Sequence, residues 1–231
     1  MSDPTPEAPQ PPAKRRLSTR GACAFCLRSF SKGAIVRHLE TCPARQAAHL
    51  PGRKGSVHIS VESRDDRRYW MHLEVANSAI LADLDVFVRD TWLECCGHLS
   101  EFRAGRMSYA SSPDPDWNDG SMDVPVGRVL QPGAALEYDY DFGSTTRLYI
   151  RVRENHPFRS GEAPVVLLAR NEAPEWTCVA CGAPATAVCT TCIWEGSGFL
   201  CEKCSGEHPC TEEMLLPVVN SPRMGVCGYV G

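Results

Sequence analysis

The side chains most able to do chemistry in this 231-residue chain are its 13 cysteines, most of which occur as Cys-x-x-Cys pairs. Such a pair presents two thiolates on one tight turn, as tetrahedral zinc sites require. In a reducing compartment these pairs indicate metal sites, and a secreted disulfide scaffold is the alternative. The N-terminus lacks the apolar stretch of a secretory signal, and no apolar run is long enough to span a membrane. We therefore expect a cytoplasmic, metal-binding protein.

The first candidate metal site lies near the N-terminus. Cys23 and Cys26 are followed after eleven residues by His38, and then by Cys42. A histidine and a cysteine four residues apart share one face of a helix and can complete a tetrahedron around zinc. A segment this short cannot bury enough apolar surface by itself, so metal binding would supply its folding free energy.

Two classes of partner suit this finger. The segments Cys23-Ala-Phe-Cys26 and His38-Leu-Glu-Thr-Cys42 resemble the Cys-Cys-His-Cys fingers of the ubiquitin-binding type found in DNA-repair proteins. That resemblance implies that Glu40 contacts a ubiquitin-like protein.

Charge indicates a different partner, because residues 1–54 contain ten Lys and Arg but only three Asp and Glu. Arg28, Lys32 and Arg37 could then contact the phosphates of a nucleic acid. A basic tail that only improves solubility is the third interpretation.

The second candidate region contains eight ligands in four pairs, enough for two zinc ions: Cys178, Cys181, Cys189, Cys192, Cys201, Cys204, His208 and Cys210. The regular pairing resembles cross-braced modules such as MYND or B-box fingers. That resemblance implies that the first pair shares an ion with the third, and the second pair with the fourth. Sequential pairing is the alternative that the spacing leaves open. With the first finger, we expect about three zinc ions, each fully ligated by protein and therefore structural.

Three cysteines fall outside these patterns, namely Cys95, Cys96 and Cys227, and His98 lies close to the first two. A metal site built from them would need distant segments of the chain to meet. Reduced thiols without a ligand are the commoner interpretation.

The residues between the two regions are expected to form an α+β domain. Residues 69–75 alternate between apolar and polar side chains, which predicts a strand. Residues 80–92 have apolar side chains at helical spacing, with Ser78 as the expected N-cap. Residues 136–142 and 148–152 predict a β-hairpin, and residues 165–169 a further strand.

Three carboxylates, Glu137, Asp139 and Asp141, recur at period two on the first hairpin strand. They could form a catalytic or magnesium site. The arginines of the next strand offer partners, so we expect a surface ion-pair ladder instead. A nuclease or hydrolase acting near DNA, using these carboxylates or the Cys95–His98 segment, is the enzymatic alternative. Because no Walker, HExxH, GxSxG or GxGxxG motif occurs, we assign no catalytic residues.

The segment Leu136-Glu-Tyr-Asp-Tyr-Asp-Phe-Gly-Ser144 resembles a hallmark of the plasmid pRiA4b ORF-3-like family, also described as transposon passenger proteins of a TnpR-like type. Residues 81–99 and the ending 220–229 strengthen the resemblance, which covers residues 57–231. It implies a curved mixed sheet with helices packed on one side. It implies no established activity, and it associates the chain with mobile elements and DNA transactions.

We therefore expect five segments: a disordered tail (1–20), a zinc finger (21–45), an α+β domain (56–172), a two-zinc module (176–212) and a C-terminal tail packed on the body (213–231). Pro51, Gly52 and Gly55 would form a flexible joint, so that the body folds without the finger. The expected function is that of a non-enzymatic zinc-binding adaptor, and a structural subunit of a larger assembly is a further alternative.

Overall fold

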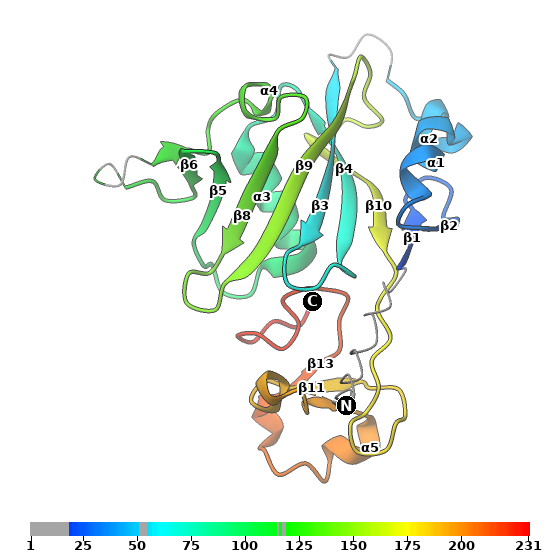
Figure 1. The fold of residues 1–231 in the computed structure, drawn as a ribbon, viewed down its shortest axis with the longest axis vertical. Helices are drawn as coiled ribbons and strands as arrows, with labels where there is room; N and C mark the ends of the chain where they lie inside the picture. The colour runs from blue at the N-terminus through cyan, green and yellow to red at the C-terminus, as the bar shows by residue number, and fades with distance from the viewer. Residues whose placement is uncertain (1–18, 51–54, 115, 117–118) are drawn as a thin grey trace, which may run out of the picture.

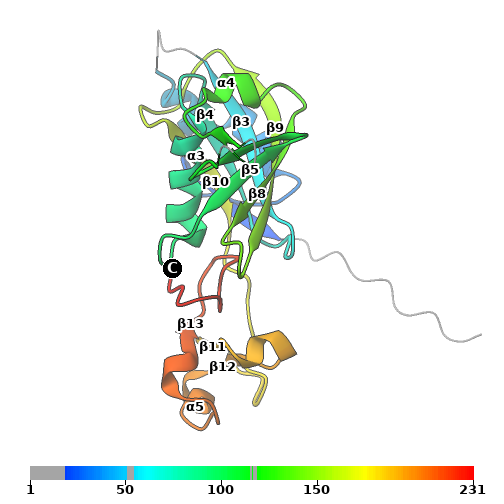
Figure 2. The same ribbon diagram turned by 90° about the vertical axis from the view of Figure 1, so that its left-hand side faces the viewer.

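A computed structural model describes residues 19–50, 55–114, 116 and 119–231 of the chain. Residues 1–18 of the expected tail, and Pro51 and Gly52 of the expected joint, lie outside the described residues. The body is one large sheet, and a smaller cysteine-rich module lies beyond one end of it (Figures 1 and 2). In the described part of the chain, no helix has the length and apolar character needed to cross a membrane.

The main sheet has ten strands, which in spatial order are β2 (Ser29–Ser31), β1 (Arg20–Cys23), β10 (Val165–Asn171), β4 (Trp70–Ala76), β3 (Ser56–Ser63), β9 (Thr146–His156), β8 (Ala135–Tyr140), β5 (Ser100–Ala104), β6 (Met107–Ala110) and β7 (Gly120–Ser121). Neighbouring strands are antiparallel except for β6 and β7, which are parallel. The helical elements of this body are α1 (Ile35–Thr41), α2 (Pro43–Ala47), α3 (Leu81–Val88), the π-helical turn η1 (Arg89–Leu93) and α4 (Val126–Val129). The expected α+β class with a mixed sheet is confirmed.

The cysteine-rich module contains a three-stranded sheet in the order β12 (Phe199–Leu200), β11 (Ala187–Cys189), β13 (Leu215–Pro217). Short helical turns connect these strands: η3 (Cys192–Glu195), α5 (Glu202–Ser205) and η4 (Glu212–Met214). The strands are only two or three residues long. A sheet this small cannot enclose a core of its own, so the module depends on other links between its loops.

The expected hairpin is confirmed as β8 and β9, with Leu136 opposite Ile150 and Tyr138 opposite Leu148. These apolar side chains are buried in the main core, together with Leu84 of α3. Alternation along both strands therefore places one apolar face against the helical layer and leaves the other face outside.

The expected helix also exists, but its start differs from the prediction. Residues 81–88 are α-helical, and the last turn widens into η1. The N-cap is Ile80 rather than Ser78, because Ile80 is still extended and bridges to Pro125. The Asp83 carboxylate accepts a hydrogen bond from the Ile80 backbone N–H at 3.0 Å, which satisfies one free donor of the first turn.

Strand β4 is buried on both faces, although its sequence alternates like that of a half-exposed strand. Met71, Leu73 and Val75 belong to the main core. Trp70, on the opposite face, packs in a second core with Ile35 and other residues of the N-terminal finger. The finger therefore covers the outer face of β4.

The finger packs extensively against the body, which counts against the expectation that the body folds independently of it. Strand β1 of the finger pairs antiparallel with β10 and extends the main sheet, with Gly21 opposite Asn171. The Trp70 indole N–H donates to Thr19 Oγ1 at 2.8 Å. A Cβ atom on Gly21 would collide with the Trp70 ring, so glycine is required for this close approach. The spacing of residues in the sequence does not predict this pairing, because the pairing depends on which edge strand of the folded sheet is free.

A buried ion pair joins the same two parts. The Arg45 guanidinium donates to Glu74 Oε2 at 2.9 Å, and both side chains are 2% exposed. Arg45 also donates to the Leu39 carbonyl oxygen at 3.0 Å, and the Ser160 hydroxyl donates to Glu74 Oε2 at 2.9 Å. Each buried charge is thus neutralised and hydrogen-bonded, which is the condition for tolerating it inside a protein.

Replacing Arg45 with alanine should lower the free energy of unfolding by about 3–5 kcal/mol, because it leaves the buried Glu74 carboxylate unpaired. Urea denaturation of the metal-loaded full chain, followed by circular dichroism, measures this. The control is Arg37→Ala, on the exposed side of α1, for which the change should stay within about 0.5 kcal/mol. Equal effects of the two substitutions would contradict the assigned role of Arg45.

Candidate metal centres

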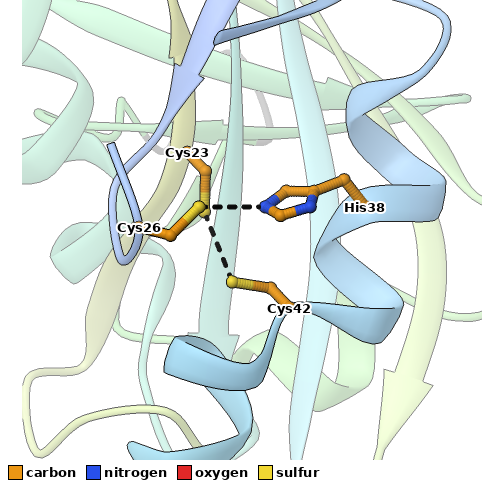
Figure 3. Close-up of side chains that lie close together, drawn as sticks. All are labelled: Cys23, Cys26, His38 and Cys42. Atoms are coloured by element: carbon orange, nitrogen blue, oxygen red, sulfur yellow. Dashed lines mark hydrogen bonds between the residues drawn. The ribbon is translucent and has the colours of Figure 1, made fainter. Parts of the chain in front are cut away.

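The first candidate metal centre lies where β1 meets α1. Cys23 ends β1, Cys26 lies in the following turn, His38 is on α1 and Cys42 follows that helix (Figure 3). Leu27 adopts a left-handed conformation with φ 59°, so the chain reverses directly after the second cysteine. The two halves of the ligand set therefore face each other across the finger.

The geometry of this centre fits a tetrahedral ion. Cys23 Sγ lies 3.9 Å from Cys42 Sγ, and Cys26 Sγ lies 3.2 Å from His38 Nε2. Tetrahedral zinc with Zn–S bonds of about 2.3 Å separates its sulfur ligands by about 3.8 Å. The His38 ring stacks on Phe30, with 3.9 Å between ring centroids, which fixes its orientation.

Burial raises the pKa of the Cys23 thiol to about 11. At neutral pH this thiol would be protonated in the absence of a cation, and a metal ion would convert it to the thiolate. The chemistry of the donor set and the spacing of the atoms both fit a bound metal ion.

The four pairs of the C-terminal module are grouped alternately. One group contains Cys178, Cys181, Cys201 and Cys204, and the other contains Cys189, Cys192, His208 and Cys210. In the first group Cys181 Sγ lies 3.6 Å from Cys201 Sγ. In the second, Cys192 Sγ lies 3.7 Å from Cys210 Sγ and 3.5 Å from His208 Nε2. Of the two pairings that the spacing leaves open, the structure contains the cross-braced one.

Backbone hydrogen bonds hold the first of these groups and favour the thiolate form of Cys178. Cys178 donates its N–H to the Ala183 carbonyl oxygen at 2.7 Å, which closes the turn that carries Cys181. The backbone N–H of Cys201, directed at the Cys178 sulfur, is the largest cause that lowers the pKa of that thiol to about 6. A thiol that ionises this readily is prepared to bind a metal at neutral pH.

A fourth cluster joins the cysteines that the spacing patterns leave over. Cys95, Cys96 and His98 lie together with Cys227, and their four ligand atoms are within 4.8 Å of one another. The sequence contained a signal for this cluster, since these were the only unassigned cysteines. It could not show that the C-terminal end returns to the segment after η1.

The three carboxylates of the hairpin do not converge on one site. Glu137 and Asp139 both accept hydrogen bonds from Arg103 of β5, at 3.1 and 3.0 Å. Their ion-pair partner therefore lies on the neighbouring strand β5, and the expectation of a ladder with the arginines of β9 is wrong. Asp141 lies beyond the end of β8 with φ 64° and pairs with Arg223 at 2.8 Å. Among the described residues, no cluster of candidate metal ligands includes these carboxylates.

The candidate partner-binding residues of the finger differ in whether their side chains are free to contact a partner. Lys32 Nζ lies 2.6 Å from Glu62 Oε2, so its charge is already paired. The Arg28 guanidinium lies over the Phe30 ring, 5.5 Å from its centroid. Arg37 and Glu40 are exposed on α1. The geometry thus leaves Arg28, Arg37 and Glu40 able to meet a partner.

A mixed sheet with clustered cysteines and histidines on its flanking segments defines an α+β protein with sites able to hold metal ions. The family described as "Plasmid pRiA4b ORF-3-like protein" matches residues 55–184, which is more than half of the chain. The chain therefore belongs to the plasmid pRiA4b ORF-3-like family. The match leaves out the first metal centre and most ligands of the C-terminal module.

Among solved structures, the chain is similar to a protein of unknown function, MM3350 from Methanosarcina mazei Go1. The two are 16% identical with a TM-score of 0.46, over 51% of this chain and 70% of that one. A comparison with curated proteins finds no match.

The alternate grouping predicts how cadmium NMR will respond to single substitutions. Among the clusters found in the described residues, Cys204 belongs to the only one with four thiolates, whereas Cys189 belongs to one that includes histidine. In the chain loaded with ¹¹³Cd, the resonance furthest downfield comes from the four-thiolate centre. Cys204→Ser should remove that resonance, and Cys189→Ser should retain it. Sequential pairing would produce the opposite result for the two variants.

Proposed function

We propose that this protein is a non-enzymatic, zinc-stabilised adaptor that binds nucleic acid on the outer face of its main sheet. The observation that carries the proposal is a basic depression of about 460 Å³ beside the finger. Its lining residues come from β3, β9 and the loop after β3: Ser60, Glu62, Ser63, Arg64, Arg67, Tyr149, Arg151 and Arg153. We refer to these residues as the basic depression.

The positive charge of the basic depression exceeds its negative charge. Glu62, its one carboxylate, is paired with both Lys32 and Arg67. Within the described ranges, Arg64, Arg151 and Arg153 have no carboxylate partner. Guanidinium groups that are exposed and free of carboxylates bind phosphate oxygens readily, often with two parallel hydrogen bonds.

An aromatic ring lies among these arginines. Tyr149 is half-buried on β9, and the Arg64 guanidinium lies over its ring at 5.7 Å from the centroid. Alternating arginines and an aromatic ring suit a strand of nucleic acid, because phosphates contact the cations while a base can stack.

The finger borders the same surface and adds to its charge. Lys32 donates to the Arg67 carbonyl oxygen at 2.9 Å, which places β2 and the following turn against the rim of the basic depression. Arg28 and Arg37 of the finger are exposed and carry further positive charge. The plasmid origin of the family name agrees with a role in the DNA transactions of mobile elements.

We assign zinc to the first centre and to the two centres of the C-terminal module. Thiolate and imidazole ligands at tetrahedral spacing favour zinc over magnesium or calcium, which prefer oxygen. Each of these centres has four protein ligands and leaves no position for a substrate, so the ions stabilise structure. This supports an adaptor rather than a metalloenzyme.

A ubiquitin-like protein is the second candidate partner. Its support is Glu40, which is exposed on α1 between two ligands of the first centre. Arg151 and Arg153 would not be needed for that interaction.

The proposal predicts that Arg151→Glu/Arg153→Glu weakens nucleic-acid binding at least about tenfold, because two phosphate contacts become repulsive. Fluorescence anisotropy with labelled single-stranded and duplex oligonucleotides measures the affinity over a salt series. For the unaltered chain, the log–log slope should be about −0.9 per phosphate contact on duplex DNA and about −0.7 on single strands.

The matched control is Arg106→Glu, an exposed arginine in the β5–β6 turn, which should bind like the unaltered chain. A chain that binds neither oligonucleotide would refute the proposal. Ubiquitin binding that is lost in Glu40→Ala and insensitive to the double reversal would assign the function to the finger instead.

A further inference from the structure

We propose that Cys95, Cys96, His98 and Cys227 form a fourth zinc site, which fastens the C-terminal end of the chain to the body. Cys96 Sγ lies 3.7 Å from Cys95 Sγ and 3.6 Å from Cys227 Sγ. His98 Nε2 lies 3.0 Å from Cys96 Sγ and 3.5 Å from Cys227 Sγ. The four ligand atoms thus surround a common point.

These distances match those of the other three centres. In each of the other centres one pair of sulfur atoms is separated by 3.6–3.9 Å, and tetrahedral zinc implies about 3.8 Å. A disulfide would require about 2.05 Å between two sulfurs. The three thiols are therefore spaced for sharing an ion rather than for oxidation to a pair.

The distribution of cysteine in the whole chain supports the same assignment. The sequence contains 13 cysteines, and every one of them belongs to one of the four clusters. Three histidines complete the clusters, so that each contains four ligands. A chain with incidental thiols would leave some of them outside such groups, and this chain leaves none.

The fourth cluster exists because buried contacts hold the C-terminal segment in place. Arg223 is fully buried and donates to Asp141 Oδ2 at 2.8 Å and to Thr146 Oγ1 at 3.2 Å. The Ser221 hydroxyl donates to the Trp92 carbonyl oxygen at 2.5 Å, at the end of η1. These contacts hold Ser221 and Arg223 against the body, near the segment that carries Cys95. Cys227, four residues after Arg223, is thereby brought to that segment.

The backbone at the cluster is also constrained. Cys227 has φ 54°, in the left-handed region that non-glycine residues rarely occupy. Gly97, between two of the ligands, has φ 79°, and its N–H donates to Glu94 Oε1 at 2.6 Å. These conformations turn Cys96, His98 and Cys227 toward one another, and a bound ion offsets the strain at Cys227.

The fourth site differs from the first in exposure. Cys96 and Cys227 are exposed, whereas Cys23 and Cys42 are fully buried. A chelator reaches the fourth site directly, so its zinc should leave before that of the first centre. Loss of that ion would release the residues that follow the buried Arg223 without unfolding the main core. This inference does not depend on nucleic-acid binding.

Metal analysis of the reduced full chain tests the proposal, using zinc-loaded protein of known concentration. The unaltered chain should contain about four zinc ions, in line with its four clusters. Cys227→Ser should reduce the content by one ion. Leu99→Ser, at an exposed position next to His98, is the matched control and should retain all ions.

Hydrogen exchange adds a readout specific to this site. In Cys227→Ser the amides of residues 226–231, beyond the buried Arg223, should lose protection, whereas Cys26→Ser should lose one ion and leave those amides protected. His98→Asn provides a second variant if Cys227→Ser fails to fold. Equal zinc content in the unaltered chain and both variants would overturn the proposal. So would a Cys96–Cys227 disulfide found by mass spectrometry in protein prepared under reducing conditions.

Discussion

The carboxylate of Glu74 is buried in the middle of the main sheet, and it is neutralised by Arg45 from the N-terminal finger. A lone ionised carboxylate cannot remain in that position, because its desolvation costs several kcal/mol. The finger is therefore part of the fold rather than an attachment to it. Its strand β1 extends the sheet and its apolar residues cover Trp70. The first candidate metal centre is therefore packed against the body.

A second buried arginine has the corresponding role at the other end of the chain. Arg223 pairs with Asp141, just beyond the hairpin strand β8, and positions the C-terminal end against the body. Both cysteine-rich ends are short and cannot enclose a hydrophobic core. Each is instead closed by clustered thiols and attached to the sheet by a buried ion pair. Clusters able to hold metal ions and buried ion pairs thus occur in the same segments.

The finger and the ion pairs of β8 leave one part of the outer face of the main sheet uncovered. The finger covers β4, and Arg103 neutralises the carboxylates of β8. Between them, β9 and the loop after β3 present exposed arginines around Tyr149. The charge of that face is set by residues that alternate with the core-facing side chains of the same strands, so the sheet that builds the core also builds the candidate binding surface.

The sequence by itself determined the local features: the α+β class, the hairpin of β8 and β9, and the Cys-x-x-Cys pairs with their following ligands. Short-range spacing decides these, because alternation and tight turns act over a few residues. Only the tertiary structure decided that the finger joins the sheet, that the four pairs are cross-braced, that Arg103 and Arg223 neutralise the hairpin carboxylates, and that Cys227 meets Cys95. These contacts join residues far apart in the chain. They depend on which strand edges are unpaired and which buried charges lack a partner once the sheet has folded.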